Sequence, residues 1–185
     1  MPIMTVRYGA GDLDATARAD LAKRLTEIMI RMEGGANTPG GRAFAWVLFE
    51  ESAPGAWWAG GEAGDEYIAP PGRYLVRVDI PEGYMNAAHK SEVHAWVTEA
   101  ILAVRPASGP QAGHSIQVIV NEIPEGNWAA AGRTISLANI AESVGLPKTG
   151  SRFAWAKAYF AAKARARAAA GYPADAGGLW ADQPR

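Results

Sequence analysis

The chain has 185 residues, 49% of them hydrophobic and 20% charged, and a formal net charge of −1. This length suits one compact domain or two small units that share a core, and the composition is ordinary for a soluble globular protein. The near-zero charge argues against a dedicated nucleic-acid-binding protein, because such proteins usually carry a strong excess of basic residues.

Composition and hydropathy exclude several further kinds of site. The chain contains no cysteine, which excludes disulfides, zinc–thiolate sites, iron–sulfur clusters and thiol nucleophiles. No carboxylate spacing around its three histidines suggests a metal site, so we expect no metal and no cofactor. No apolar run approaches the roughly 20 residues that span a bilayer, and the start MPIMTVRYGAG lacks the regions of a secretory signal. We therefore expect a soluble cytoplasmic protein with no membrane partner.

The first elements in chain order form a strand–helix–strand pattern. Residues 2–8 (PIMTVRY) mix β-branched and aromatic residues, which predicts a strand. Asp14 is a candidate N-cap for a helix that ends at the glycine pair 34–35. Its apolar residues recur at helical spacing: Leu21, Leu25, Ile28, Met29 and Met32. Residues 43–51 (AFAWVLFEE) predict a second strand, too continuously apolar to be half exposed. This is the β-α-β pattern, whose two strands are parallel.

The same pattern follows a second time. Residues 74–80 (YLVRVDI) and 115–122 (SIQVIVNE) predict two more strands. Between them Asn86 is a candidate N-cap for a helix that Pro106 closes. We therefore divide the chain into a first unit with its hairpin (2–61), a linker (62–73), a second unit with its hairpin (74–145), and a C-terminal helix and tail (146–185).

A repeated loop supports duplication of this unit. The segment PEGNWAAAG at 124–132 is similar to APGAWWAGG at 53–61. Four pairs match at one offset of 71 without a gap: Glu51 with Glu122, Gly55 with Gly126, Trp57 with Trp128, and Gly61 with Gly132. The sequence thus indicates two β-α-β units in tandem.

Two such units predict an α+β fold, with a four-stranded sheet and both helices on one face. The other face would be bare, and an uncovered apolar face usually mediates association, so we expect a homo-oligomer. Each Gly-Trp hairpin suits a contact with a neighbouring subunit. The Ala-rich residues 151–170 predict a further helix packed on the surface or on a partner, with a phosphate- or nucleic-acid-binding arm as the alternative. The residues after it are expected to be a poorly ordered tail.

Pro2 is the candidate catalytic residue, because removal of Met1 would leave the chain with a secondary amine at its start. An α-amino group titrates near pH 7.7–8.0, and apolar surroundings lower that value by disfavouring the cation. A proline held at the start of a buried strand is therefore a general base suited to neutral pH. The alternative is that the Met-Pro start has no functional meaning.

Taken together, the proline, the β-α-β pattern and the aromatic hairpin resemble the tautomerase superfamily, typified by 4-oxalocrotonate tautomerase. The strongest stretch is VIVNEIPEGNWAAAG at 118–132, and the resemblance covers residues 2–140. It implies the fold that tautomerases share with macrophage migration inhibitory factor. It also implies a trimer, as in two-unit members such as cis-3-chloroacrylic acid dehalogenase and malonate semialdehyde decarboxylase. Trp128 falls where the family places an active-site aromatic.

Several family positions differ in this chain. The arginines that handle substrate carboxylates are replaced by Asp12 and Trp46 in the first unit and by Tyr84 and Gln117 in the second. The arginine pair after the third strand in the dehalogenases and decarboxylases becomes Pro81 and Tyr84. The second unit starts at Gly72, Arg73 or Tyr74, so only the first unit offers a catalytic proline. The missing cations disfavour hydration and decarboxylation, which need a polarised substrate.

The sequence therefore predicts a cofactor-free tautomerase that acts on a small keto or unsaturated carboxylic acid, with the Pro2 amine as general base. Trp128 would wall the pocket, Tyr84 or backbone N–H groups would stabilise the dienolate, and Arg42 would hold a carboxylate. Asn127 and Trp57 are further candidate substrate contacts.

Alternatives remain for these residues and for the function. Either tryptophan would also suit an interface anchor, and Arg42, like Arg73, Arg77 and Arg133, would also suit a surface or interface salt bridge. A protonated-Pro2 hydratase, dehalogenase or decarboxylase is one alternative function. A non-catalytic oligomeric binding protein on the same scaffold is the other.

Overall fold

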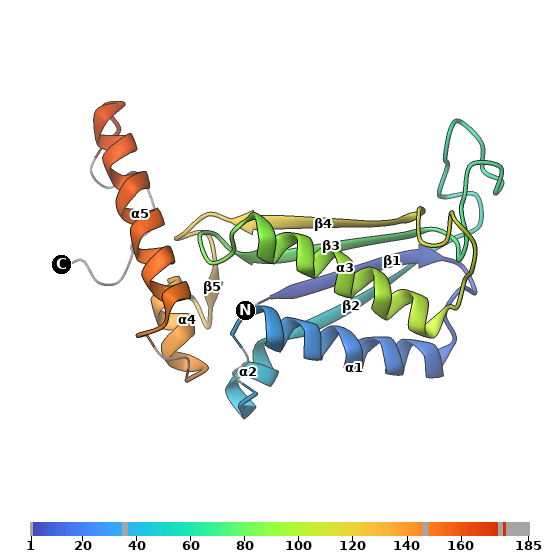
Figure 1. The fold of residues 1–185 in the computed structure, drawn as a ribbon, viewed down its shortest axis with the longest axis horizontal. Helices are drawn as coiled ribbons and strands as arrows, with labels where there is room; N and C mark the ends of the chain where they lie inside the picture. Colours follow the sequence, from blue (N-terminus) through green and yellow to red (C-terminus); the bar gives the residue numbers. More distant parts are fainter. Residues whose placement is uncertain (1, 35–36, 146–147, 174–175, 177–185) are drawn as a thin grey trace.

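The protein is a twisted four-stranded sheet with two long helices on one face and a helical extension at one end (Figure 1). A computed structural model describes residues 2–34, 37–145, 148–173 and 176. The strand order is β2-β1-β3-β4, in which β1 pairs parallel with β2, β3 pairs parallel with β4, and the central pair β1–β3 is antiparallel. The strands are β1 (Ile3–Gly9), β2 (Trp46–Ser52), β3 (Tyr74–Pro81) and β4 (Ile116–Ile123).

Helices α1 (Ala15–Met32) and α3 (Ala87–Val104) cover the same face of the sheet (Figure 1). Both begin at the predicted caps: the Asp14 side chain accepts a hydrogen bond from the Ala17 N–H, and that of Asn86 from the His89 N–H. The core lies between these helices and alternate residues of the strands, among them Met4, Val6, Leu25, Val76 and Val97, which are all fully buried.

The structure confirms the predicted fold class and shows the duplication in its register. β1 begins at Ile3 and β3 at Tyr74, which are again 71 positions apart. Because the two central strands run in opposite directions, the two units are related by an approximate twofold axis through the sheet.

The second strand begins later than the sequence predicts, because α2 (Pro39–Phe44) occupies part of that segment. Thr38 caps this short helix by accepting from the Gly41 N–H, and Pro39 is its first residue. Both are common helix-start residues. Residues 43 and 44, expected in the strand, therefore form the last turn of α2.

The two repeated loops differ in structure. The first contains only an isolated bridge between Ala59 and Glu62, whereas the second forms a short hairpin of β5 (Ala129–Ala130) and β6 (Arg133–Thr134). Two helices follow the second hairpin: α4 (Leu137–Ser143), which the sequence did not indicate, and α5 (Ser151–Ala169), which it did. Most of the predicted tail, at 174–175 and 177–185, lies outside the described residues.

The face of the sheet opposite the helices remains uncovered. Val47, Phe49, Val118 and Val120 pack toward the core, so the residues that alternate with them point the other way. These include Trp46, Leu48 and Ile119, whose exposed fractions are 55%, 47% and 51%. Among the described residues, no helix is long and apolar enough to cross a membrane.

Leu25 is fully buried between α1 and the sheet, so Leu25→Ala should remove packing that the core cannot recover. We expect a loss of about 2–5 kcal/mol in the free energy of unfolding, measured by urea denaturation. Lys23→Ala, an exposed site on the same helix, should change it by less than about 0.5 kcal/mol. Equal effects of the two substitutions would contradict this assignment of the core.

Candidate active site

The antiparallel pairing of β1 with β3 places Pro2 where several chain segments meet. Ile3 pairs with Asp79 near the end of β3, so the start of β1 lies beside the ends of β3 and β4. Pro2 itself is buried, and its carbonyl accepts a hydrogen bond of 3.3 Å from the Trp46 N–H at the start of β2. The candidate base is thus fixed by the central strand and by its parallel neighbour.

Pro2 lines a small, mostly apolar pocket. The other lining residues come from the end of α1, from α2 and the residue after it, and from the residue after α4: Met29, Ile30, Glu33, Gly41, Ala45 and Val144. The cavity measures about 10 Å³, which is about enough for one water molecule. In this conformation the pocket does not hold a substrate.

The C-terminal end of α4 closes this pocket. The Thr38 hydroxyl donates to the Val144 carbonyl at 3.2 Å. A Cβ atom on Gly40 would lie 2.9 Å from the Ser143 carbonyl oxygen, so only a glycine lets the two backbones approach this closely. α4 therefore sits directly on α2 beside Pro2.

Tyr84, a predicted site residue, lies beside the same pocket. Its hydroxyl donates to the carbonyl of Glu33, a pocket-lining residue, at 3.2 Å. Burial raises the pKa of Tyr84 above its usual value, although the Arg152 charge opposes this. The phenol therefore stays a hydrogen-bond donor at neutral pH.

Arg152, on α5, is a residue that the sequence analysis did not single out. Its guanidinium donates to the Met32 carbonyl at 2.5 Å and lies 5.1 Å from the centre of the Tyr84 ring. A cation at the C-terminus of a helix interacts favourably with the helix dipole. Its only sequence signal was its place in a basic, Ala-rich segment.

The other predicted substrate contacts do not line the Pro2 pocket within the described part of the chain. Arg42 pairs with Glu27 at 2.6 Å and also donates to the Asn37 side chain, and it is about half exposed. Trp128 and Asn127 lie on the second hairpin, where Trp128 is half-buried and Asn127 exposed. Trp57 lies at the opposite end of the sheet, where it lines a second cavity.

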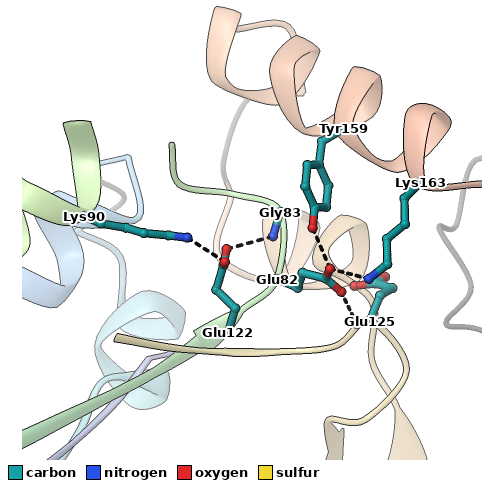
Figure 2. Close-up of polar contacts among 7 residues, drawn as sticks. All are labelled: Glu82, Gly83, Lys90, Glu122, Glu125, Tyr159 and Lys163. Atoms are coloured by element: carbon teal, nitrogen blue, oxygen red, sulfur yellow. Dashed lines mark hydrogen bonds and ion pairs between the residues drawn. The ribbon is translucent and has the colours of Figure 1, made fainter. Parts of the chain in front are cut away.

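A buried cluster of two carboxylates ties the extension to the strand ends (Figure 2). Glu82, directly after β3, accepts hydrogen bonds from the Tyr159 hydroxyl at 2.6 Å and from the Lys163 ammonium group, both on α5. Glu125, in the turn after β4, accepts from the Leu137 N–H at the start of α4. Both glutamates are buried, with residue exposures of 8% and 9%.

The two carboxylates differ in their protonation. Burial opposes the ionisation of Glu82, but hydrogen bonds from Lys163 and Tyr159 outweigh it and lower its pKa. For Glu125, burial and the Glu82 charge raise the pKa to about 7, although the Leu137 N–H opposes them. The pair therefore combines one ionised carboxylate with one that titrates near neutral pH.

Two contacts beside this cluster also fix α5 and the strand ends. The Glu122 side chain bridges Lys90, at 2.6 Å, and the Gly83 N–H, at 3.3 Å (Figure 2). Gly83 has a φ of +81°, and a Cβ atom there would lie 2.8 Å from ring atoms of both Tyr159 and Phe160. α5 thus packs directly against this glycine.

Comparison with solved structures identifies the fold. A member of the cis-3-chloroacrylic acid dehalogenase family matches with a TM-score of 0.60 at 25% identity, over 80% of this chain and 94% of that chain. A fused 4-OT symmetric trimer matches with a TM-score of 0.57 at 20% identity, over 74% and 97%. Macrophage migration inhibitory factor of Toxoplasma gondii matches with a TM-score of 0.55 at 13% identity, over 72% and 99%.

No protein-family model and no curated protein sequence matches the chain. The structural matches confirm, at the level of the fold, the resemblance to the tautomerase superfamily.

The Glu125 carboxyl should titrate near pH 7 in the folded protein. Because this pKa is raised above its ordinary value of 4.5, the carboxyl favours the folded state most below pH 4.5 and loses that contribution as the pH rises through about 7. The thermal midpoint should therefore fall over this range in the wild type and fall less in Glu125→Gln.

Carbon-13 NMR of the Glu side chains would give the titration directly, with Glu142→Gln on the exposed face of α4 as the control. Titration of Glu125 near its ordinary value would contradict the prediction.

Proposed function

We propose that this protein is a cofactor-independent tautomerase in which the Pro2 amine, freed by removal of Met1, is the general base. The observation that carries the proposal is the position of Pro2: buried at the start of a central strand, in an apolar pocket, on a tautomerase fold. Apolar walls disfavour a cation, so they favour the neutral amine that a base requires.

The proposed reaction is a proton shift on a small keto acid. The Pro2 nitrogen takes a proton from the carbon next to the carbonyl group. The electron pair of the broken C–H bond forms a carbon–carbon double bond, and the π pair of the carbonyl group moves onto its oxygen to give an enolate. The protonated amine then returns the proton to the enolate oxygen or to a conjugated carbon, which restores the base. This sequence needs no oxidant, metal or co-substrate.

Tyr84 is the proposed donor to the enolate oxygen. Its hydroxyl already points toward the pocket wall through its bond to the Glu33 carbonyl, and burial keeps it protonated. A donor aimed at developing charge in a site without water is a strong source of rate enhancement. Backbone N–H groups at the strand ends are the alternative donors.

For the substrate carboxylate, Arg152 is better placed than Arg42. Arg42 is held by Glu27 and Asn37, whereas Arg152 contacts Met32 and Tyr84 next to the pocket. An arginine side chain can form two parallel hydrogen bonds to a carboxylate, so the position of the arginine relative to the pocket affects how well a substrate acid is held.

Substrate entry needs a wider pocket, and movement of α4 away from α2 would provide it. A small acid needs far more room than the present cavity of about 10 Å³. The contacts that must separate are those of Thr38 with Val144 and of Gly40 with Ser143. The Glu82–Glu125 cluster would keep the extension attached while its edge at Val144 opens.

We also propose that the chain assembles as a homotrimer through the uncovered sheet face. That face presents Trp46, Leu48 and Ile119, and one of the matching proteins is described as a symmetric trimer of fused 4-OT. In such an assembly Asn127 and Trp128, on the second hairpin, would reach a Pro2 site in a neighbouring subunit.

Pro2→Ala tests the general base. We expect the rate of phenylpyruvate enol-to-keto conversion to fall about 10²-fold or more, which is the range for a positioned general base, while intact mass shows that Met1 is absent. Pro54→Ala, in an exposed loop at the other end of the sheet, should retain full activity. Retention of Met1, or equal activity of both variants, would refute the proposal. If the wild-type protein itself had no activity, the result would favour the alternative of a non-catalytic binding protein.

Trp46→Glu tests the trimer, because a charge on the uncovered face should prevent its burial. Sedimentation velocity should show a trimer for the wild type and mostly monomer for the variant. Trp58→Glu is the matched control, since Trp58 is as exposed but lies in the first loop. A trimer that persists in Trp46→Glu would place the interface elsewhere.

A further inference from the structure

A second, much larger cavity lies at the end of the sheet opposite Pro2. Its volume is about 630 Å³, within the usual range of ligand pockets, roughly 300–1,000 Å³. Its walls include Asp12 after β1, Trp57 after β2, Gly72 and Arg73 before β3, and Arg105 after α3. None of these groups takes part in the reaction proposed for Pro2.

The duplication makes the end of the sheet at this cavity the counterpart of the Pro2 end. At the offset of 71, Arg73 corresponds to Pro2, Trp57 to Trp128 and Asp12 to Gly83. At the Pro2 end the extension fills the corresponding space, with Tyr159 and Phe160 against Gly83 and Val144 against Pro2. Both α4 and α5 lie at that end, whereas the other end carries only connecting loops, the one at 53–73 among them (Figure 1).

Arg73 is fixed in the wall of the cavity by groups of its own loop. Its guanidinium pairs with Asp65 at 2.6 Å and donates to the carbonyls of Ala63 and Gly64, and its side chain is only 16% exposed. Its Nε atom is buried without a hydrogen-bond partner in the described part of the chain. A buried donor in this state requires an explanation, such as a missing ligand or water.

A second basic group, Arg105, is loosely held. It lies 3.6 Å from the Asp12 carboxylate and is more than one-third exposed, a distance too long for a good hydrogen bond. The buried Tyr74 hydroxyl makes no hydrogen bond of good geometry among the described residues, and it interacts with both the Arg105 and the Asp12 charge. Burial raises the pKa of Asp12, although the Arg105 charge opposes this.

We propose that this cavity binds a small planar carboxylate, with the Arg105 guanidinium on the carboxylate, the Arg73 charge beside it, and the half-buried Trp57 ring against the flat part of the ligand. The ligand carboxylate takes the place of Asp12 at Arg105. This site has no general base for a proton transfer. Arg73 occupies the position that Pro2 has in the first unit, and its backbone nitrogen is part of a peptide bond. The second unit thus keeps a binding site and lacks the base.

Titration with benzoate tests this site, followed by the indole N–H signal of Trp57 in nitrogen-15 spectra of the full chain. Trp57→Phe assigns that signal among the seven tryptophans. Benzoate should shift it in a saturable manner, and the neutral analogue benzamide should not. Arg105→Gln should weaken benzoate binding roughly tenfold or more, the effect expected for a hydrogen bond to a charged group.

Three controls make the result decisive. Arg105→Lys, which keeps the charge, should retain part of the affinity and reports on folding, whereas Arg133→Gln, exposed on the other hairpin, should leave it unchanged. Pro2→Ala should bind benzoate as the wild type does, so this test stands apart from the proposed tautomerase activity.

The proposal is overturned if benzoate leaves the Trp57 signal unshifted, if benzamide binds equally well, or if Arg105→Gln binds as the wild type does. It is also overturned if binding occurs only in Trp46→Glu, since the cavity would then be a subunit contact.

Discussion

The antiparallel pairing of β1 with β3 determines where everything else in this protein lies. Each β-α-β unit alone places its two strand ends at one edge and the start of its first strand at the other. Only the reversed central pair brings the start of β1 next to the ends of β3 and β4. The buried proline, the carboxylate pair and the α4–α5 extension are neighbours for this reason.

The same pairing gives the sheet two ends of related geometry, and the rest of the chain covers only one of them. One end is covered by the extension, and its pocket has room for about one water molecule. The other end is open, with a cavity more than an order of magnitude larger. The duplication therefore gives the sheet two ends of related backbone geometry, and the helices that follow the second unit cover only one of them.

The sequence was sufficient for the parts of the fold that depend on local patterns. Hydrophobic periodicity and the caps Asp14 and Asn86 located α1 and α3, and the repeated Gly-Trp loop revealed the duplication. Local patterns did not predict the two short helices, α2 and α4, and the reasons are physical. The Ala43-Phe44 end of α2 continues an apolar run typical of a strand, and the capping box of α4 uses Asn139 rather than a Glu or Gln.

The candidate site was less predictable, because its contacts join residues that are distant in sequence. Pro2 and Tyr84 could be named from the family pattern. No local signal shows that Arg152 reaches the end of α1, or that Lys163 meets Glu82 across 81 positions. Glu125 was visible only as part of a repeated turn, since its burial depends on how α4 packs.

The Glu82–Glu125 pair also makes the two ends of the duplicated sheet unequal. At the offset of 71, the positions of Glu82 and Glu125 correspond to Gly11 and Pro54, neither of which has an acidic side chain. The far end therefore offers no equivalent acceptors for Lys163 and Tyr159, and α5 has only one of two nearly symmetric places to dock. The chain leaves β4 at the Pro2 end, and these two carboxylates hold the extension in place there.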